Sequence, residues 1–206
     1  MEELHIGNLK IKLPIIQGGM GIGVSMSGLA GTVANHGGVG VIAVAGLGMF
    51  EPDYARNFLE ANARALKKEI QKAKAMTDGV LGVNIMVALT NFSNLVKTSI
   101  EEGIDIIFAG AGLPLNLPQY LTEGAKTKLV PIVSSGRAAK ILCSKWKGLF
   151  DYLPDAIVVE GPKAGGHLGF KREQLDDPDF ALEKLLPEVV EQVKYFEEKY
   201  RTKIPV

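Results

Sequence analysis

One loop in the last quarter of the chain brings together the residues that are best suited to chemistry. Glu160 follows the short apolar run Asp155–Val159, and within a few residues come the paired glycines Gly165 and Gly166 and then His167. Paired glycines carry no Cβ atoms, so their backbone can approach a flat or charged ligand closely. A histidine beside such a gap can take up or release a proton near neutral pH. The stretch therefore predicts a ligand site with His167 as its proton-handling group.

A second loop of small residues follows the first apolar run of the chain. Gly19, Met20 and Gly21 lie in the segment Gln17–Gly23. The glycine spacing matches neither the phosphate-binding loop nor the dinucleotide fingerprint. The bare backbone of this loop would suit contact with a planar ring, and a tight turn chosen for packing is the alternative.

The same pattern recurs after other apolar runs. Asn84 lies inside the apolar segment Gly82–Met86, where an amide without a partner would cost about 1–3 kcal/mol. It could bond a neighbouring strand end or a ligand. Gly110–Pro114 and Ser134–Gly136 are again small residues after a strand. Taken together with Glu160, these loops favour a flat cofactor over a set of unrelated turns.

Other reactive side chains have simpler explanations. Cys143 is the single cysteine and lies among apolar neighbours near Trp146, so we expect an inert thiol in the core. His5 and His36 lack a glycine-rich surrounding and are expected to be structural. The charged residues of 60–74 are expected to form a solvated helix face with i,i+4 pairs. No His, Cys and Asp cluster has the spacing of a metal site.

Composition narrows the class of partner. The 206 residues include 23 Lys+Arg and 23 Asp+Glu, so the formal net charge is zero and no basic field favours nucleic acid or an anionic membrane. There is no apolar run of transmembrane length and no signal peptide. One cysteine fits a reducing compartment. We expect a cytoplasmic protein that acts on a small molecule.

Short apolar strands alternate with helices along the chain. An N-terminal hairpin is expected at 4–6 and 9–11 around Gly7. The expected strands are 14–17, 39–45, 80–87, 104–109, 129–133 and 156–159. The expected helices are 27–35, 52–75, 91–102, 118–123, 137–150 and 180–200.

This alternation predicts an α/β fold with a parallel sheet. An open doubly wound sheet would concentrate its ligand loops at one point, whereas a (β/α)₈ barrel collects loops from all strands at one face. Small-residue loops at many strand ends favour the barrel. Six strands are two short of a barrel, and 203–206 read as the start of another strand. We therefore expect one partial TIM-barrel domain over 1–206 without strands seven and eight, either incomplete or completed by a second polypeptide.

These residues resemble the nitronate monooxygenase family, formerly called 2-nitropropane dioxygenase, and its close relative, the flavin-dependent enoyl-acyl-carrier-protein reductase II. The resemblance spans nearly the whole chain, and its most specific part is the motif ending in Gly165, Gly166 and His167. Its segments, in family order, are Pro14–Met20, Gly82–Met86, Gly110–Pro114, Val130–Ser135 and Glu160–Gly169.

The resemblance implies an FMN-binding TIM barrel that oxidises alkyl nitronates with O₂. Met20 and Gly21 would lie against the isoalloxazine ring, and His167 would match the catalytic histidine. The cofactor-binding set that it implies is Gly19, Met20, Gly21, Asn84, Ser134, Glu160, Gly165 and Gly166. The alternatives are an NAD(P)H-dependent enoyl-acyl-carrier-protein reductase or a non-catalytic fragment of either enzyme.

Two features depart from the family pattern. Many nitronate monooxygenases carry Gln at the position of Glu160, and Glu looks like the reductase branch, whereas Gly161 and Pro162 look like the monooxygenase branch. The family's phosphate-binding loops follow strands seven and eight, so we expect the 206-residue chain alone to bind FMN weakly or not at all. A homo-oligomer or a complementary C-terminal segment is the expected partner.

Overall fold

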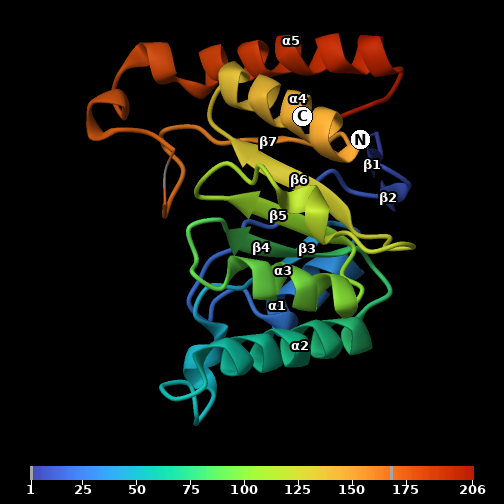
Figure 1. The fold of residues 1–206 in the computed structure, drawn as a ribbon, viewed down its shortest axis with the longest axis vertical. Coiled ribbons are helices and arrows are strands. Elements are labelled where there is room, and N and C mark those ends of the chain that lie inside the picture. The colour runs from blue at the N-terminus through green and yellow to red at the C-terminus, as the bar shows by residue number, and fades with distance from the viewer. Residues whose placement is uncertain (1, 168) are drawn as a thin grey trace. The chain divides into compact units, whose positions relative to one another are not determined.

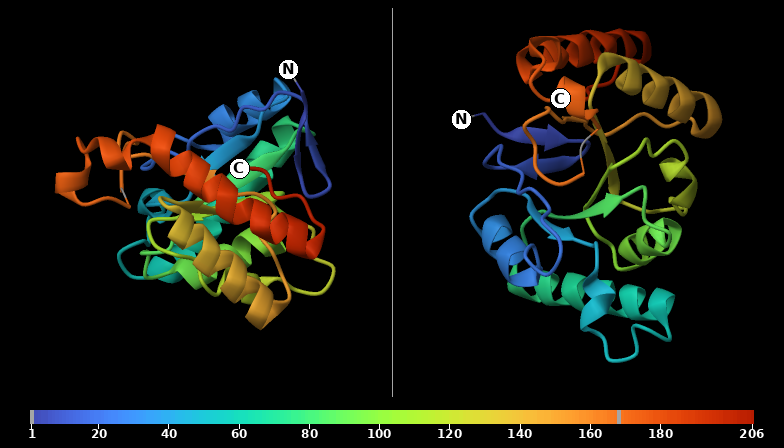
Figure 2. Two further views of the ribbon diagram at one scale, coloured as in Figure 1. Left: turned by 90° about the horizontal axis from the view of Figure 1, so that it is seen from above. Right: turned by 90° about the vertical axis from the view of Figure 1, so that its left-hand side faces the viewer.

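The computed structural model describes residues 2–167 and 169–206, which form an α/β fold (Figures 1 and 2). The chain divides into two compact units: unit 1 holds the residues up to Phe108 together with Tyr120–Lys128, and unit 2 holds Ala109–Gln119 and Leu129–Val206. The strands are β1 (Leu4–Ile6), β2 (Leu9–Ile11), β3 (Gly40–Ala43), β4 (Leu81–Met86), β5 (Ile106–Gly110), β6 (Lys128–Val133) and β7 (Val158–Val159). The α-helices are α1 (Ser27–Asn35), α2 (Phe58–Met76), α3 (Phe92–Glu101), α4 (Gly136–Phe150) and α5 (Leu182–Tyr200).

Unit 1 contains the hairpin and the first parallel strands. β1 and β2 pair antiparallel with Leu4 opposite Ile11, over the two ranges that the sequence predicts. β3 and β4 pair in parallel from Gly40 opposite Leu81, and β5 follows β4 in the strand order. α2 packs along α1 and α3 (Figure 1). β3 is buried along its whole length, as expected for a strand with both faces covered.

Unit 2 continues the same alternation. β6 and β7 pair in parallel, with Ile132 opposite Val158. The N–H of Ile157, just before β7, donates to the carbonyl of Pro205 over 2.8 Å, but the segment 203–206, expected to begin a strand, forms no strand. α4 and α5 pack against each other (Figure 1).

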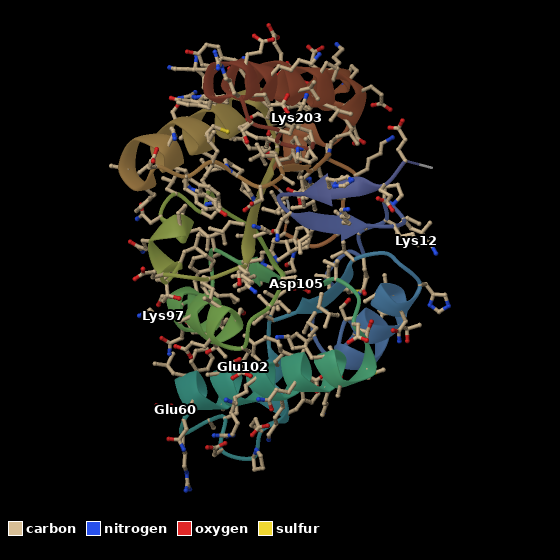
Figure 3. All side chains as sticks on the ribbon, turned by 90° about the vertical axis from the view of Figure 1, so that its right-hand side faces the viewer. Lys12, Glu60, Lys97, Glu102, Asp105 and Lys203 are labelled. Carbon is tan, nitrogen blue, oxygen red and sulfur yellow. The ribbon has the colours of Figure 1, made fainter. Side chains whose placement is uncertain are left out.

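Two aspartates, each just before a strand, form hydrogen bonds with the backbone at the start of the neighbouring strand. The Asp105 carboxylate accepts a hydrogen bond from the N–H of Leu81 over 2.9 Å, and its own N–H donates to the Leu81 carbonyl (Figure 3). Asp155 makes the same two bonds with Leu129 in unit 2. Both lie at the amino-terminal ends of the strands, the end that serves stability in barrels of this class.

Several predicted boundaries are wrong. The strand expected at 14–17 is reduced to one parallel bridge between Ile16 and Val39. The helix expected at 52–75 begins at Phe58, because Glu51 and Asp53 are held by ion pairs instead of entering the helix. The helix expected at 118–123 is a single 3₁₀ turn, Leu117–Tyr120. The other elements agree with the expected ranges to within two residues at each end.

The charged face of α2 also differs from the expectation of i,i+4 pairs. Lys67 instead pairs with Glu102, at the end of α3, over 2.7 Å (Glu102 is labelled in Figure 3), and an ion pair within the helix joins Lys72 to Glu69 at i,i+3 spacing. Glu69 is buried, not solvated, and its carboxylate accepts from the N–H of Ser27 at the first turn of α1 over 2.9 Å. The contact ties α2 to the start of α1, where a negative charge is favourable.

We expect this contact to make stability depend on pH. Burial opposes ionisation of Glu69, but hydrogen bonds from Lys72 and Ser27 outweigh it, so its pKa lies below the ordinary 4.5. The stabilisation is then complete above pH 4.5 and is lost as the pH falls through the lower folded-state pKa. Glu69→Gln keeps an acceptor for Ser27 and removes the charge. Urea unfolding should show it about 1–2 kcal/mol less stable than the parent at pH 7.

The control is to compare the urea unfolding of the parent and of Glu69→Gln again at acid pH. Below the folded-state pKa both side chains are neutral, so the difference between parent and variant should disappear. A difference that stays constant from pH 7 to pH 3 would contradict a role for the Glu69 charge.

Candidate functional site

The first glycine-rich loop is closed by two side chains that sequence reasoning left out. Ser25 is buried, and its hydroxyl accepts from the N–H of Met20 over 3.0 Å and donates to the carbonyl of Gly18 over 3.3 Å. The Gln17 amide both donates to and accepts from the backbone of Val41 in β3. These bonds hold residues 18–25 in one shape at the end of the first parallel segment. Gln17 begins the loop segment that the sequence singles out, but no motif predicts its bonds to Val41 or marks Ser25, because these bonds depend on how the loop returns to its own start.

The loop places part of the predicted cofactor set together. A Cβ atom added to Gly19 would lie 2.5 Å from Cβ of Asn84, so the loop backbone rests directly on this residue of β4. The Asn84 side chain is half-buried, and its amide makes no hydrogen bond with the described part of the chain. Met20 is exposed beside it, and Gly21 lies next to Ala45. Asn84 therefore has the two features that a ligand-facing amide requires: its side chain has no partner in the described part of the chain, and it lies next to glycine backbone.

In unit 2, the loop that carries His167 is closed at its base. The Glu160 carboxylate accepts from the N–H of Gly169 over 3.1 Å, and the Ser134 hydroxyl bonds the Gly169 carbonyl over 3.5 Å. The N–H of Glu160 donates to Val133 in β6. A Cβ added to Gly169 would lie 2.8 Å from the Ser134 hydroxyl oxygen. Ser134 and Glu160 therefore meet at Gly169, a residue that sequence reasoning did not single out.

The tip of that loop is open. Gly165, Gly166 and His167 are exposed, and a Cβ added to either glycine would meet no atom within 4 Å. Gly166 has a φ of +86°, a conformation that favours glycine. Leu168, also part of the motif, lies outside the described residues. The imidazole of His167 makes no contact within the described chain that would occupy its nitrogens.

The predicted site residues thus form two connected groups, one in each unit. Gly19, Met20, Gly21 and Asn84 belong to unit 1, and Ser134, Glu160, Gly165, Gly166 and His167 belong to unit 2. The role of each residue toward a cofactor stays a prediction. The unit 1 group offers exposed backbone and the Asn84 amide, and the unit 2 group offers exposed backbone and the His167 imidazole; neither side chain has a hydrogen-bond partner among residues 2–167 and 169–206.

Cys143 is not part of this chemistry. The thiol is buried in α4, and burial raises its pKa to about 12. A thiol held protonated in this way is a poor nucleophile, which agrees with the core position that the sequence predicts. In the part of the chain that the structure describes, no helix is both long and apolar enough to span a membrane.

Comparison with known proteins identifies the family. The sequence model of the nitronate monooxygenase family matches residues 2–206. A probable nitronate monooxygenase of Staphylococcus haemolyticus is 25% identical over 223 residues, covering 90% of this chain and 56% of its own length. A 7a-methyl-1-oxo-octahydroindene carboxyl-CoA dehydrogenase of Mycobacterium tuberculosis is 29% identical over 159 residues, covering 77% of this chain and 38% of its own.

A solved structure, FabK from Thermotoga maritima, superimposes with a TM-score of 0.65 at 29% identity over 88% of this chain and 48% of that one. The chain therefore spans between about two fifths and just over half the length of these relatives. FabK is a TIM-barrel enzyme, which confirms the predicted fold class. With the family match over its whole described length, the chain belongs to the nitronate monooxygenase family of flavin-dependent oxidoreductases.

Proposed function

We propose that this protein is an FMN-dependent oxidoreductase that oxidises alkyl nitronates with O₂. The observation that carries the proposal is the free Asn84 amide beside the backbone of Gly19, in a loop of a chain that matches the nitronate monooxygenase family from end to end. This amide is reached by water and has both of its hydrogen-bonding groups available to a ligand within the described part of the chain.

The residues present fit a flat, polar ring. In unit 1, a Cβ added to Gly18 would meet no atom within 4 Å, and in unit 2 the same holds for Gly165 and Gly166, so each loop leaves open space beside its own backbone. The Asn84 amide can both donate to and accept from ring heteroatoms. Bound FMN would take up the substrate's electrons and deliver them to O₂, which is chemistry that no side chain here supplies.

The remaining residues would orient the substrate and handle charge. The His167 imidazole, exposed and without a hydrogen-bond partner among the described residues, would hold the negative charge of the nitronate or move a proton. Glu160, occupied by the N–H of Gly169, would act as a fixed acceptor that keeps the His167 loop in place rather than as a donor to the ring. In family members with Gln at this position, the side-chain amide oxygen would accept the hydrogen bond that the Glu160 carboxylate accepts here.

A second candidate is NAD(P)H-dependent reduction of an enoyl thioester. It is favoured by the resemblance to the flavin-dependent enoyl-acyl-carrier-protein reductase II and by the similarity to a dehydrogenase whose name specifies a coenzyme A substrate. One anaerobic experiment separates the two. The FMN-loaded protein is mixed with a primary alkyl nitronate or with NADH, and the flavin absorbance is followed.

Rapid loss of flavin absorbance with the nitronate, and recovery when air is admitted, is the result we expect. Bleaching by NADH alone would support the thioester reductase instead. Absence of bleaching with either reagent in a protein that retains FMN would argue against both reactions.

A further inference from the structure

Two neighbouring loops of unit 1 expose a group of large apolar side chains. The first loop follows the segment paired with β3, and the second follows β3 itself. Between 53% and 62% of each of these residues is exposed to solvent. The group, called the apolar patch below, consists of Met20, Ile22, Val24, Met49 and Phe50.

The two loops touch each other through this patch. A Cβ added to Gly23 would lie 2.8 Å from the ring of Phe50, so the ring rests on the glycine backbone. A Cβ added to Gly46 would lie 2.9 Å from the side chain of Ile22. Both contacts need a glycine with positive φ, +74° and +75° respectively, so the interlock depends on residues that leave room for the partner.

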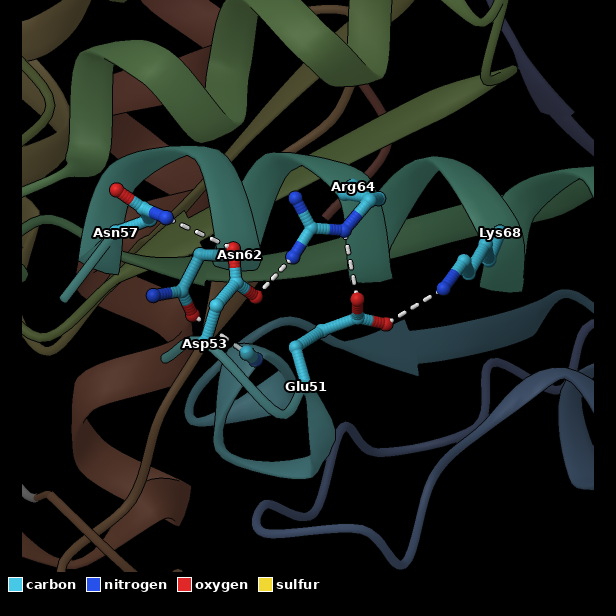
Figure 4. A network of polar contacts seen from close by, with 7 residues as sticks. Glu51, Asp53, Asn57, Asn62, Arg64 and Lys68 are labelled. Carbon is cyan, nitrogen blue, oxygen red and sulfur yellow. Dashed lines mark hydrogen bonds and ion pairs between the residues drawn. The ribbon is translucent and has the colours of Figure 1, made fainter. Parts of the chain in front are cut away.

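The second loop is also tied to α2 by a polar network (Figure 4). Glu51, next to Phe50, accepts from Arg64 over 2.6 Å and from Lys68 over 2.8 Å. Arg64 pairs with Asp53 as well. Together with the bonds of Ser25 in the first loop, this network fixes the two loops that carry the exposed apolar side chains. Preorganised exposed apolar surface is typical of a binding site.

Another side chain of α2 binds the backbone of the second loop directly. Asn62 of α2 is buried, and its side-chain oxygen accepts from the N–H of Gly48 over 3.1 Å. Its amide nitrogen donates to the carbonyl of Phe58 over 2.7 Å. The turn that carries Met49 and Phe50 is therefore held at two points, the backbone N–H of Gly48 and the carboxylate of Glu51.

The size of the patch favours a small hydrocarbon ligand. At 150–250 Å² for a large buried side chain, five that are half-exposed offer on the order of 500 Å². A stable protein interface buries about 800 Å² on each partner. Met20, a member of the patch, lies in the loop that the proposed function places against the flavin, so an alkyl chain extending from a reacting head group would lie on the patch.

We infer that the apolar patch binds the alkyl chain of the substrate, which makes unbranched nitronates of four or more carbons the preferred class. The inference rests on the proposed function for its head group. The chain-binding step itself is independent of turnover and can be measured without it.

The test uses straight-chain alkanoates from butanoate to decanoate, whose planar carboxylate has the charge of a nitronate but does not react. Titration calorimetry of the protein with FMN present should show Kd falling about two- to fourfold for each added methylene. Phe50→Ser and Met49→Ser should each flatten this dependence. Leu149→Ser, an equally exposed position on α4, should leave it unchanged.

NMR of methyl-labelled methionine locates the ligand without relying on variants. Decanoate should shift the resonances of Met20 and Met49 and leave that of Met76, at the end of α2, in place. An affinity independent of chain length, or shifts confined to other methionines, would overturn the inference. So would conversion of a dimer to a monomer by Phe50→Ser in light scattering, because the patch would then be covered by a second copy.

The two proposals fail separately. A chain-length dependence that is lost in Phe50→Ser, without turnover of any nitronate, would keep the alkyl site and remove the proposed reaction. Turnover of nitronates at rates independent of chain length, with alkanoates bound equally, would keep the reaction and remove the alkyl site.

Discussion

Replacement of Gly40 by alanine is expected to lower the free energy of unfolding by about 3 kcal/mol or more. A Cβ at this position would lie 1.8 Å from the backbone oxygen of Ala30 and 2.5 Å from its carbonyl carbon. Both atoms belong to the backbone of α1, so neither can rotate away. To admit one methyl group, α1 must move off β3 and open the buried contact between them. Urea unfolding followed by circular dichroism measures the loss.

Gly28→Ala is the matched control. Gly28 lies in the same helix as Ala30, and a Cβ there would meet no atom within 4 Å. The substitution should be neutral or should stabilise by about 0.5–1 kcal/mol, because alanine loses less conformational freedom than glycine in a helix. Equal stability of the two variants would show that α1 does not pack on β3 as described.

His167→Asn is expected to reduce nitronate turnover by about 10²–10⁴-fold while FMN stays bound. Asparagine keeps a polar side chain of similar reach but cannot carry a positive charge or exchange a proton near neutral pH. Because His167 is exposed and makes no contact within the described chain, its loss should leave stability unchanged. Oxygen consumption and flavin absorbance of the same sample provide the two readouts.

His5→Asn serves as the control, since His5 lies on the hairpin opposite Lys10 and its imidazole pairs with Glu3 over 3.8 Å. It should turn over at the parental rate. Full turnover by His167→Asn would remove the histidine from the proposed mechanism. Loss of FMN from that variant would instead assign His167 to cofactor binding.

Local signals account for the parts of the fold that the sequence predicts best. The hairpin around Gly7 and the helix Ser27–Asn35 agree with the structure at every residue, because a turn or a glycine stop marks their ends. The start of α2 was missed because Glu51 and Asp53 bind Arg64, which lies more than ten residues away. Glu69 was expected in solvent because its partner, Ser27, is 42 residues distant.

In the candidate site, too, local sequence signals mark some residues, and contacts between separate segments determine others. Small residues after apolar strands mark Gly19 and Asn84 in unit 1 and Glu160 in unit 2, and their roles toward a cofactor stay predictions. Ser25 and Gly169, which close the two loops, were not found. Their bonds depend on backbone paths that return to an earlier residue, and no spacing rule encodes such paths.

The buried indole of Trp146 has a practical consequence. It is the single tryptophan of the chain, it belongs to unit 2, and its ring nitrogen donates to the carbonyl of Pro114 over 3.0 Å. Intrinsic fluorescence excited at the indole band will therefore report on unit 2 alone, whereas the far-ultraviolet signal sums both units. Superimposable denaturation curves from the two probes would mean that the units melt as a single cooperative block, and separated midpoints would give the stability of each.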